Sequence, residues 1–393
     1  METKYLIFYP SDVMKHSFPK HSLTIWLSIT GLCLVLFFVF TAEQQLPSLK
    51  KVFIKDFYVG VAVNQGQMAG YLPSDVALVK KQFDSVSPEN VLKWSRVQPK
   101  PHTFNFGPAD KYVKFGMKND MFIIGHNLVW HKQVPDWVFK NDDGKPVSRE
   151  VLLKRMKYHI DKVVGRYKGK INGWDVVNEA LTEQGKLRDT KWLKIIGSDY
   201  IEKAFEYAHK ADPDAQLYYN DFNLWKPAKR EGVIRLVKEL QKKGIRIDGI
   251  GMQGHWYLHK PSDDQIEASI QAFSKLGVKV MISELDISVL PIPKDHDNPP
   301  PSIRHSRDPA LNPYANGLPD SVKNALATRY ASLFRLFEKH KDAITRVTFW
   351  GLNDKETWRN NWPVIGRKDY PLLFNRYNQP KEAFYSVVET SGK

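Results

Sequence analysis

Short apolar runs recur along the chain from about residue 52 onward, and polar or amphipathic stretches separate them. Most of these runs are rich in β-branched or aromatic residues, which is typical of strands buried on both faces of a sheet. The pattern predicts eight strands, at residues 57–63, 83–86, 122–128, 171–177, 216–219, 247–252, 278–282 and 346–350.

Amphipathic stretches fill the intervals between these strands. In residues 149–166 the apolar side chains of Leu152, Met156 and Ile160 recur at helical spacing, which predicts a helix with one buried face. Similar patterns predict helices at residues 199–211, 228–243, 262–276 and 321–341. Ser262 and Ser321 are expected to cap the last two helices at their N-termini.

Eight strands that alternate with helices predict an α/β fold, closed as a (β/α)₈ TIM barrel over residues 52–389. A doubly wound open sheet is the main alternative, but no glycine-rich phosphate loop follows the first strand to support it. No linker divides this part of the chain, so we expect a single domain. The proline-rich residues 291–319 follow the seventh strand and predict a long loop on the face where barrel active sites lie.

An uncharged apolar run at residues 23–40 stands apart from this pattern and has about the minimum length that spans a bilayer. Lys15 and Lys20 precede it, which favours export of the chain after residue 40. We expect a short cytoplasmic or n-region at 1–22, a signal anchor or signal peptide at 23–40 and a polar linker at 41–51. Phe40 stands where cleavage after Ala42 would need a small side chain, so an uncleaved membrane anchor is favoured over a secreted or periplasmic product.

The composition narrows the possible functions. The single cysteine, Cys33, lies in the apolar run, so the predicted barrel has no disulfide and no cysteine metal site. The formal net charge is +15, but no interleaving of basic and aromatic residues indicates nucleic-acid binding. The chain contains 11 tryptophans, and rings beyond those needed for the core are compatible with a cleft that stacks on sugars.

Two glutamates follow strand-like apolar runs. Glu179 ends the sequence Trp-Asp-Val-Val-Asn-Glu, and Glu284 ends Val-Met-Ile-Ser-Glu. Carboxylates at the carboxyl ends of barrel strands meet on one face of the barrel. Two such groups can cleave a glycosidic bond, one as proton donor and one as nucleophile or base.

Seven motifs in this order, each at the end of a predicted strand, resemble family 10 glycoside hydrolases, the endo-β-1,4-xylanases. The resemblance runs from about residue 52 to residue 384. Two motifs are the segments around the glutamates, at residues 174–180 and 282–287. Two lie before them: Ser-Pro-Glu-Asn at 87–90 with Lys-Trp at 93–94, and Gly-His-Asn at 125–127 with Trp-His at 130–131. The other three are Tyr-Asn-Asp at 219–221, Gly-Met-Gln-Gly-His-Trp at 251–256, and Trp-Gly at 350–351 with Asp354 and Trp358.

The resemblance implies distinct roles for the two glutamates. Glu179 resembles the general acid/base, whose site should raise its pKa so that it is protonated at the working pH. Glu284 resembles the nucleophile. Asn178 is similar to the asparagine that binds the sugar 2-hydroxyl, His255 to the histidine that contacts the nucleophile, and Gln253 to the glutamine of the same subsite.

The other matching residues would contact the sugar chain: Glu89, Asn90, Lys93, His126, Trp130, Trp350 and Trp358. The first three resemble residues that hydrogen-bond the glycone. The last two, both tryptophans, resemble rings that crowd the position of a hydroxymethyl group, which favours xylose over glucose. Val91, Leu92 and Phe222 depart from the family pattern, which leaves subsite affinity open.

Two further features are interpreted as structural. Asp286 would point the same way as Glu284 if the strand continued, and we expect it to support that glutamate. His126 and His131 match no usual zinc spacing and lack a third ligand, so we expect no metal and no cofactor.

Together with the predicted fold and the apolar run, the resemblance implies a monomeric, exported, retaining endo-1,4-β-xylanase that forms a covalent glycosyl-enzyme on xylan. Two alternatives remain. One is a related barrel β-glycanase, such as a cellulase or mixed-linkage glucanase. The other is a membrane-tethered glycan-binding protein that does not turn over its ligand.

Overall fold

The computed structural model describes residues 46–294 and 299–391, so the apolar run at 23–40 lies outside the described residues. Within those ranges, no helix has the length and apolar character needed to cross a bilayer. The linker was expected to extend to residue 51, whereas the compact unit begins at Ser48, and the buried Leu49 is already part of it.

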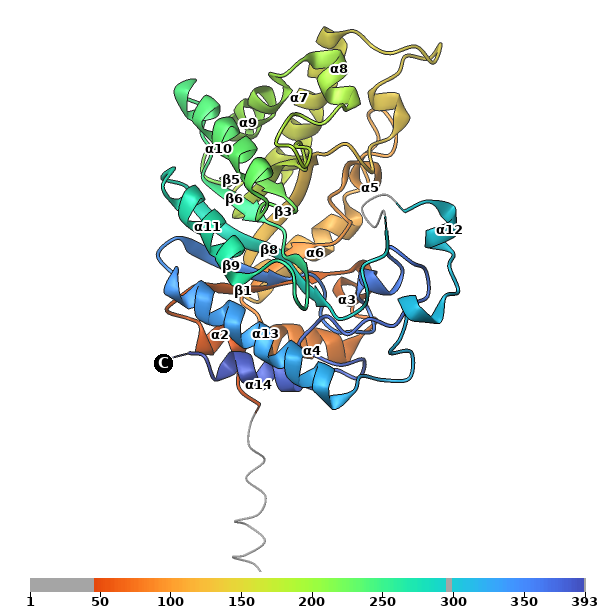
Figure 1. Ribbon diagram of the computed structural model, residues 1–393. Coiled ribbons are helices and arrows are strands. Elements are labelled where there is room, and N and C mark those ends of the chain that lie inside the picture. The colour runs from red at the N-terminus through yellow and green to blue at the C-terminus, as the bar shows by residue number, and fades with distance from the viewer. Residues whose placement is uncertain (1–45, 295–298, 392–393) are drawn as a thin grey trace, which may run out of the picture. The chain divides into compact units, whose positions relative to one another are not determined.

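A nine-stranded parallel sheet forms the centre of this unit (Figure 1). Its strands are β1 Tyr58–Val63, β2 Ser85–Pro88, β3 Phe122–Val129, β4 Gly173–Asn178, β5 Gln216–Asp221, β6 Gly249–Met252, β7 His255–Tyr257, β8 Lys279–Ser288 and β9 Ile344–Phe349. The predicted strands are all present, within two residues except at β8. β8 continues to Ser288, well beyond its predicted end at residue 282, and the short β7 is not among the predicted strands.

The pairing closes the sheet into a barrel. The strand order is β6-β5-β4-β3-β2-β1-β9-β8-β7, and β6 also pairs with β8. This closure confirms the predicted TIM barrel and excludes the doubly wound open sheet. The strand β7 follows β6 after a two-residue break and pairs with the extended end of β8, matching His255 with Asp286.

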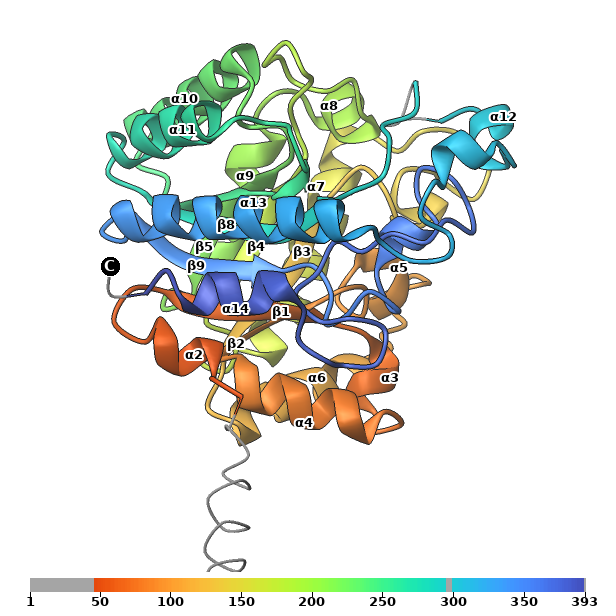
Figure 2. The ribbon, with the colours of Figure 1, turned by 60° about the horizontal axis from the view of Figure 1, so that its bottom comes forward.

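Helices surround the strands, as Figures 1 and 2 show from two directions. The longer ones are α4 Pro73–Gln82, α6 Gly107–Lys118, α7 Arg149–Arg166, α9 Tyr200–Ala211, α10 Pro227–Lys242, α11 Asp263–Ser274 and α13 Asp320–Lys339. Shorter helices are α2 Leu49–Val52, α3 Gln65–Met68, α5 Trp94–Val97, α8 Lys191–Ile196, α12 Pro301–Arg304 and α14 Glu382–Val388, with 3₁₀ turns η1 Asp136–Val138, η2 Pro309–Leu311 and η3 Trp358–Asn360.

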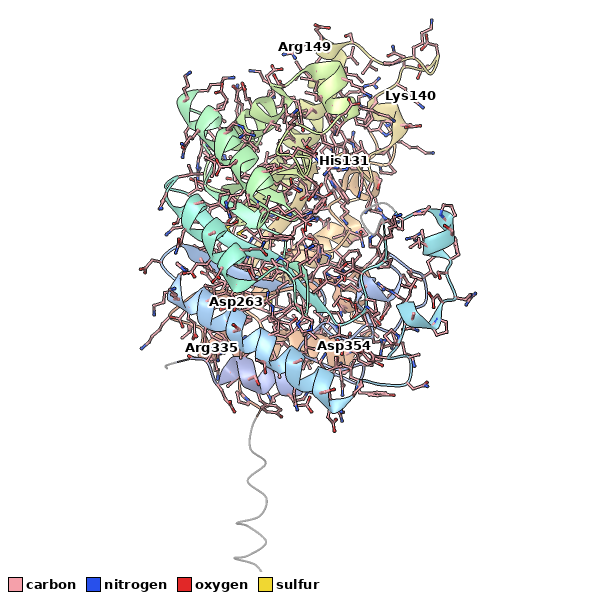
Figure 3. The ribbon with its side chains drawn as sticks, viewed as in Figure 1. His131, Lys140, Arg149, Asp263, Arg335 and Asp354 are labelled. Atoms are coloured by element: carbon pink, nitrogen blue, oxygen red, sulfur yellow. The ribbon has the colours of Figure 1, made fainter. Side chains whose placement is uncertain are left out.

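Of the two predicted N-terminal helix caps, one is confirmed and the other is wrong. Ser262 caps α11 as predicted, because its side chain accepts from the amide of Gln265. Ser321 does not cap α13. That helix begins one residue earlier, after Pro319, and Ser321 lies in its first turn. Asp263, labelled in Figure 3, pairs with Arg329 and so joins the start of α11 to α13.

Close packing inside the barrel explains why residue 125, in the Gly-His-Asn motif, is a glycine. Trp174 on β4 is fully buried. A Cβ atom at Gly125 on the adjacent β3 would lie 2.0 Å from Trp174 Cε3, so any larger residue at this position would clash. The glycine lets the two strands pair while the indole fills the space between them.

Candidate active site

Glu179 directly follows β4, and its backbone is held in a left-handed conformation with φ of 57°. Its amide donates to the carbonyl of Asn220 on β5 at 2.8 Å. The Arg188 guanidinium donates to the carbonyls of Glu179 (3.2 Å) and Leu181 (2.9 Å). A residue with a side chain adopts this conformation only at a cost, and these contacts offset that cost while fixing the turn that carries the carboxyl.

Glu284 lies within β8, and only 5% of its surface is exposed. Its Oε1 accepts from Asn220 Nδ2 at 2.8 Å, and its Oε2 lies 3.0 Å from His255 Nε2. Both carboxylate oxygens therefore have a hydrogen-bonding partner, which fixes the orientation of the group.

One hydrogen-bond network joins the two glutamates. Asn220 Nδ2 donates to Glu284 and also to Asn178 Oδ1 at 2.8 Å, and Asn178 Nδ2 donates to Glu179 Oε1 at 3.3 Å. Gln253 Nε2 adds a second donor to Glu179 at 3.3 Å. The structure therefore brings Glu179, Glu284, Asn178 and Gln253 to one place, as the sequence predicts.

The backbone of β6 makes room for this network. A Cβ atom at Gly251 would lie 2.3 Å from the side-chain oxygen of Asn220. The glycine allows the Asn220 amide to enter the barrel interior, where Ser283 donates to the same oxygen at 2.6 Å. Asn220 is therefore held at both ends of its amide group, which keeps it beside the glutamates.

His255 carries a positive charge over a wide pH range. Burial lowers its pKa, but the carboxylates of Asp286 and Glu284 outweigh burial and raise the pKa from 6.5 to about 9. His255 Nδ1 lies 3.0 Å from Asp286 Oδ1, so the imidazolium bridges the two carboxylates. A protonated ring donates through both nitrogens, which suits a role in orienting the Glu284 carboxylate.

Asp286 was expected to support Glu284, and in the structure it does so through His255, which contacts both carboxylates. It is completely buried and accepts from Arg359 Nε at 2.6 Å and from Trp358 Nε1 at 2.7 Å. Burial raises its pKa, but Arg359 and His255 outweigh burial and hold the pKa below its usual value. Asp286 thus places the Trp358 ring, which lies 4.9 Å from the ring of His255.

The pKa of Glu179 differs from the sequence-based expectation. Burial raises it, but Lys132, His131 and hydrogen bonding from Gln253 together lower it below the usual value. His131, labelled in Figure 3, is itself desolvated, which lowers its pKa to about 4. It is therefore neutral above that pH, and Lys132 is then the stronger influence of the two on Glu179.

Four predicted sugar contacts gather on a neighbouring part of the site. Lys93 Nζ donates to Asn90 Oδ1 at 3.1 Å and lies 5.2 Å from the centre of the Trp130 ring. Burial raises the pKa of Glu89 to about 7, against the lowering effect of Lys93, and Glu356 raises it further. Glu89, Asn90, Lys93 and Trp130 therefore form a coupled polar surface beside the two glutamates.

His126 and Trp350 form a different kind of contact. His126 is 3% exposed, and its Nδ1 lies 2.8 Å from Asp175 Oδ2. Its ring packs edge-on against Trp350 at 5.2 Å, so it supports the tryptophan. Trp350 follows the end of β9 instead of lying inside the strand, and Trp358 is 37% exposed. In the described part of the chain, no three His, Cys, Asp or Glu side chains gather as a metal site would require.

The proline-rich segment after β8 borders a hollow of about 430 Å³. Pro291, Ile292 and Tyr314 of this segment line it, together with Tyr257 and His259 at the end of β7, and neither glutamate does. Because β7 and β8 end here, the segment lies at the carboxyl ends of the strands. The placement agrees with the prediction that residues 291–319 form a loop on the catalytic face.

A buried ion pair under the Glu179 turn was not predicted from sequence. Lys229 on α10 is completely buried, and its Nζ lies 2.8 Å from Asp221 Oδ1. Asp221 Oδ2 accepts from the Tyr219 hydroxyl at 2.5 Å, and that hydroxyl accepts from the amide of Ala180 at 3.2 Å. The pair therefore supports the residue that follows Glu179. The polar Asn220 and Asp221 at the end of the apolar strand β5 are the signal that could have indicated it.

Known proteins are similar to this chain over nearly the whole described unit. The chain matches Glycosyl hydrolase family 10 over residues 48–390. It is 43% identical over 363 residues to Endo-1,4-beta-xylanase A of Xylanibacter ruminicola, covering 92% of this chain and 98% of that protein. It is 44% identical over 350 residues to Beta-1,4-xylanase of Dictyoglomus thermophilum, covering 88% and 92%.

The fold is also similar to those of solved xylanase structures. A GH10 endoxylanase retrieved from sugarcane soil metagenome superimposes with a TM-score of 0.83 at 41% identity, covering 88% of this chain and 99% of that one. The xylanase XynB of Paenibacillus barcinonensis gives a TM-score of 0.80 at 38% identity, with 88% and 100% covered.

Proposed function

Because the chain belongs to glycosyl hydrolase family 10, we propose that it is an endo-1,4-β-xylanase that cleaves internal bonds of xylan with retention of configuration. The observation that carries this proposal is the single hydrogen-bond network that joins Glu179 to Glu284 through Asn178 and Asn220. Two carboxyls so linked at the mouth of a barrel suit the short separation of about 5–5.5 Å that retention needs.

Glu284 acts as the nucleophile in this proposal. It attacks the anomeric carbon and forms a covalent glycosyl-enzyme, while the bond to the leaving sugar breaks. Asn220 and the His255 imidazolium each bond one of its two oxygens, which leaves a second lone pair on the attacking oxygen for the new covalent bond. The His255 ring lies 3.0 Å from Oε2 and holds the Glu284 side chain in position before the attack.

Glu179 protonates the leaving oxygen and then takes a proton from the water that releases the product. Donation requires the protonated acid, whereas its surroundings lower its pKa. We propose that a bound sugar displaces water from this carboxyl, which strengthens the effect of burial and raises the pKa when the acid is needed.

Trp350 and Trp358 support xylan over cellulose as the substrate. Trp358 is fixed by Asp286 and Trp350 packs on His126, so neither ring can move aside easily for the extra hydroxymethyl group of glucose. A rigid wall that clashes with the wrong sugar gives specificity by exclusion. We further propose that the protein is exported and works as a monomer, held at the membrane if residues 23–40 remain attached.

Comparing initial rates on purified xylan and carboxymethyl-cellulose tests the substrate, and NMR of the first products tests the stereochemistry. We expect preferential hydrolysis of xylan and products of the β-configuration. Glu179→Gln should reduce kcat by about 10²–10⁴-fold on xylan. Preference for cellulose would support the related glycanase, initial α-products would exclude retention, and unreduced activity in Glu284→Gln would exclude its role as nucleophile.

A further inference from the structure

Tyr71 and Tyr377 are far more exposed than most large apolar residues of the described chain. Their side chains are 78% and 83% exposed. Single exposed aromatics are common on protein surfaces and need no explanation. These two differ because Asn378, next to Tyr377, is hydrogen-bonded to the start of α4, the helix that follows Tyr71.

Asn378 joins the segment that carries Tyr377 to the first turn of α4. Its Nδ2 donates to Asp75 Oδ1 at 2.6 Å and to Ser74 Oγ at 3.4 Å, at the start of α4 and shortly after Tyr71. The amide of Tyr377 donates to Asn375 Oδ1 at 2.8 Å, and the amide of Tyr71 donates to the carbonyl of Gly66 at 3.1 Å. Both rings therefore project from backbone that is already ordered. Binding of a ligand would then cost little conformational entropy of the protein.

The same contacts continue toward the catalytic site. Asn378 Oδ1 accepts from Asn353 Nδ2 at 2.7 Å, and Asn353 Oδ1 accepts from the amide of Glu356 at 3.1 Å. The Glu356 carboxylate accepts from Asn64 Nδ2 at 3.4 Å and lies close enough to Glu89 for their charges to interact. Glu89 itself follows β2 at the catalytic end of the barrel.

The charges of Glu284 and Glu89 both act on Lys93. The series of interactions therefore leads from Glu284 through Lys93, Glu89 and Glu356 to Asn378, which follows Tyr377 in the sequence. A long polysaccharide that leaves the glycone side of the site past Glu89 would next meet this surface. Its pyranose rings carry C–H faces that pack on aromatic rings, while its hydroxyls remain in water.

We propose that Tyr71 and Tyr377 form a distal tyrosine site that binds the xylan chain beyond the glycone residues. This inference rests on the proposed function for the identity of the polymer. The site adds affinity for long chains, and it contributes nothing to short oligosaccharides that cannot reach it.

The test uses the full chain with Tyr71→Ala and Tyr377→Ala combined. We expect KM for soluble polymeric xylan to rise about threefold to tenfold, since each lost stacking contact weakens binding moderately. Both kcat on the polymer and kcat/KM on xylotriose should stay unchanged. In affinity electrophoresis through xylan-containing gels, the double variant should migrate faster than the unaltered protein.

Tyr385→Ala is the matched control, because Tyr385 is 46% exposed on α14 but lies outside the contacts that lead to Glu89. It should leave all values unchanged, and Tyr71→Phe with Tyr377→Phe should retain polymer binding. An unchanged polymer KM in the alanine variant, or equal losses on polymer and xylotriose, would overturn the distal site. Failure of the unaltered protein to cleave xylan would instead overturn the proposed function.

Discussion

At the scale of single residues, Lys132 and Glu179 show how a charge outside the catalytic pair can set its behaviour. Burial alone would raise the pKa of Glu179, and Lys132 is the largest of the influences that lower it. Lys132 itself is exposed. Its charge therefore affects the pH at which Glu179, the proposed proton donor, loses its proton.

Lys132→Met should raise the pKa of Glu179 and move the alkaline limb of the kcat/KM profile on xylan to higher pH. The physical reason is that removal of a nearby cation favours the protonated carboxyl. Lys140→Met is the control, because Lys140 pairs with Asp136 away from the site. An alkaline limb that stays in place or moves to lower pH in Lys132→Met would contradict this account.

Several residues of the site could be predicted because their chemistry is local. Glu179, Glu284 and Asn178 end buried apolar runs, where polar residues are costly without a function. The pKa of Glu179 could not be predicted, since it depends on Lys132 and Gln253, which lie in the segments after β3 and β6. The sequence identifies Asn220 only as part of a motif. Its role in linking Asn178 to Glu284 depends on the closed barrel, which brings their strands together.

At the scale of elements, the extension of β8 beyond its predicted end explains how Glu284 is supported. The apolar run predicts an end at residue 282, because Glu284 and Asp286 interrupt it. The strand continues because β7 pairs with it and Arg359 compensates the buried charge of Asp286. Neither partner is close in sequence, so hydrophobic pattern alone stops the strand too early.

Arg359→Met should therefore lower the free energy of unfolding by about 3–5 kcal/mol, because it leaves the Asp286 carboxylate buried without its main cation. Urea unfolding followed by fluorescence would measure the change. The control is Arg149→Met, which removes a partly exposed pair with Asp199 and should lower the stability far less. Equal losses in the two variants would show that the buried pair is not a special support of β8.

The turn after β4 offers a second test at this scale. Lys229→Met removes the cation beneath Asp221 and loosens the contacts that lead to Ala180. We expect kcat on xylan to fall more than KM changes, because Glu179 moves while the sugar contacts of Lys93 and Glu89 remain. The reverse pattern, a raised KM with normal kcat, would argue against a positioning role.

At the scale of the whole molecule, the barrel was predictable because most strands are buried apolar runs and the long helices each have one apolar face. The N-terminal boundary was less accurate, since the polar residues around Leu49 hide the fact that this side chain is buried. The short β7 was missed because three residues carry too little periodicity to distinguish a strand from a loop.

His255 links the stability of the folded unit to pH. Its folded pKa of about 9 lies above the ordinary value of 6.5. Its contribution to stability is therefore fully present below about pH 6.5 and is lost as the pH rises through about 9. The melting temperature of the unaltered protein should exceed that of His255→Gln at pH 6, and the gap should narrow by about pH 9.5. A gap that widens with pH would contradict the assigned charge.

The roles of the two glutamates are tested most directly by trapping the glycosyl-enzyme. The protein would be incubated with an activated 2-deoxy-2-fluoro-xylobioside, whose fluorine slows release of the intermediate, and then digested for peptide mass spectrometry. The account predicts one fluorosugar adduct per chain, attached to Glu284, with the label formed in Glu179→Gln as well. An adduct on another residue, or steady hydrolysis of xylan with inversion and no adduct, would contradict it.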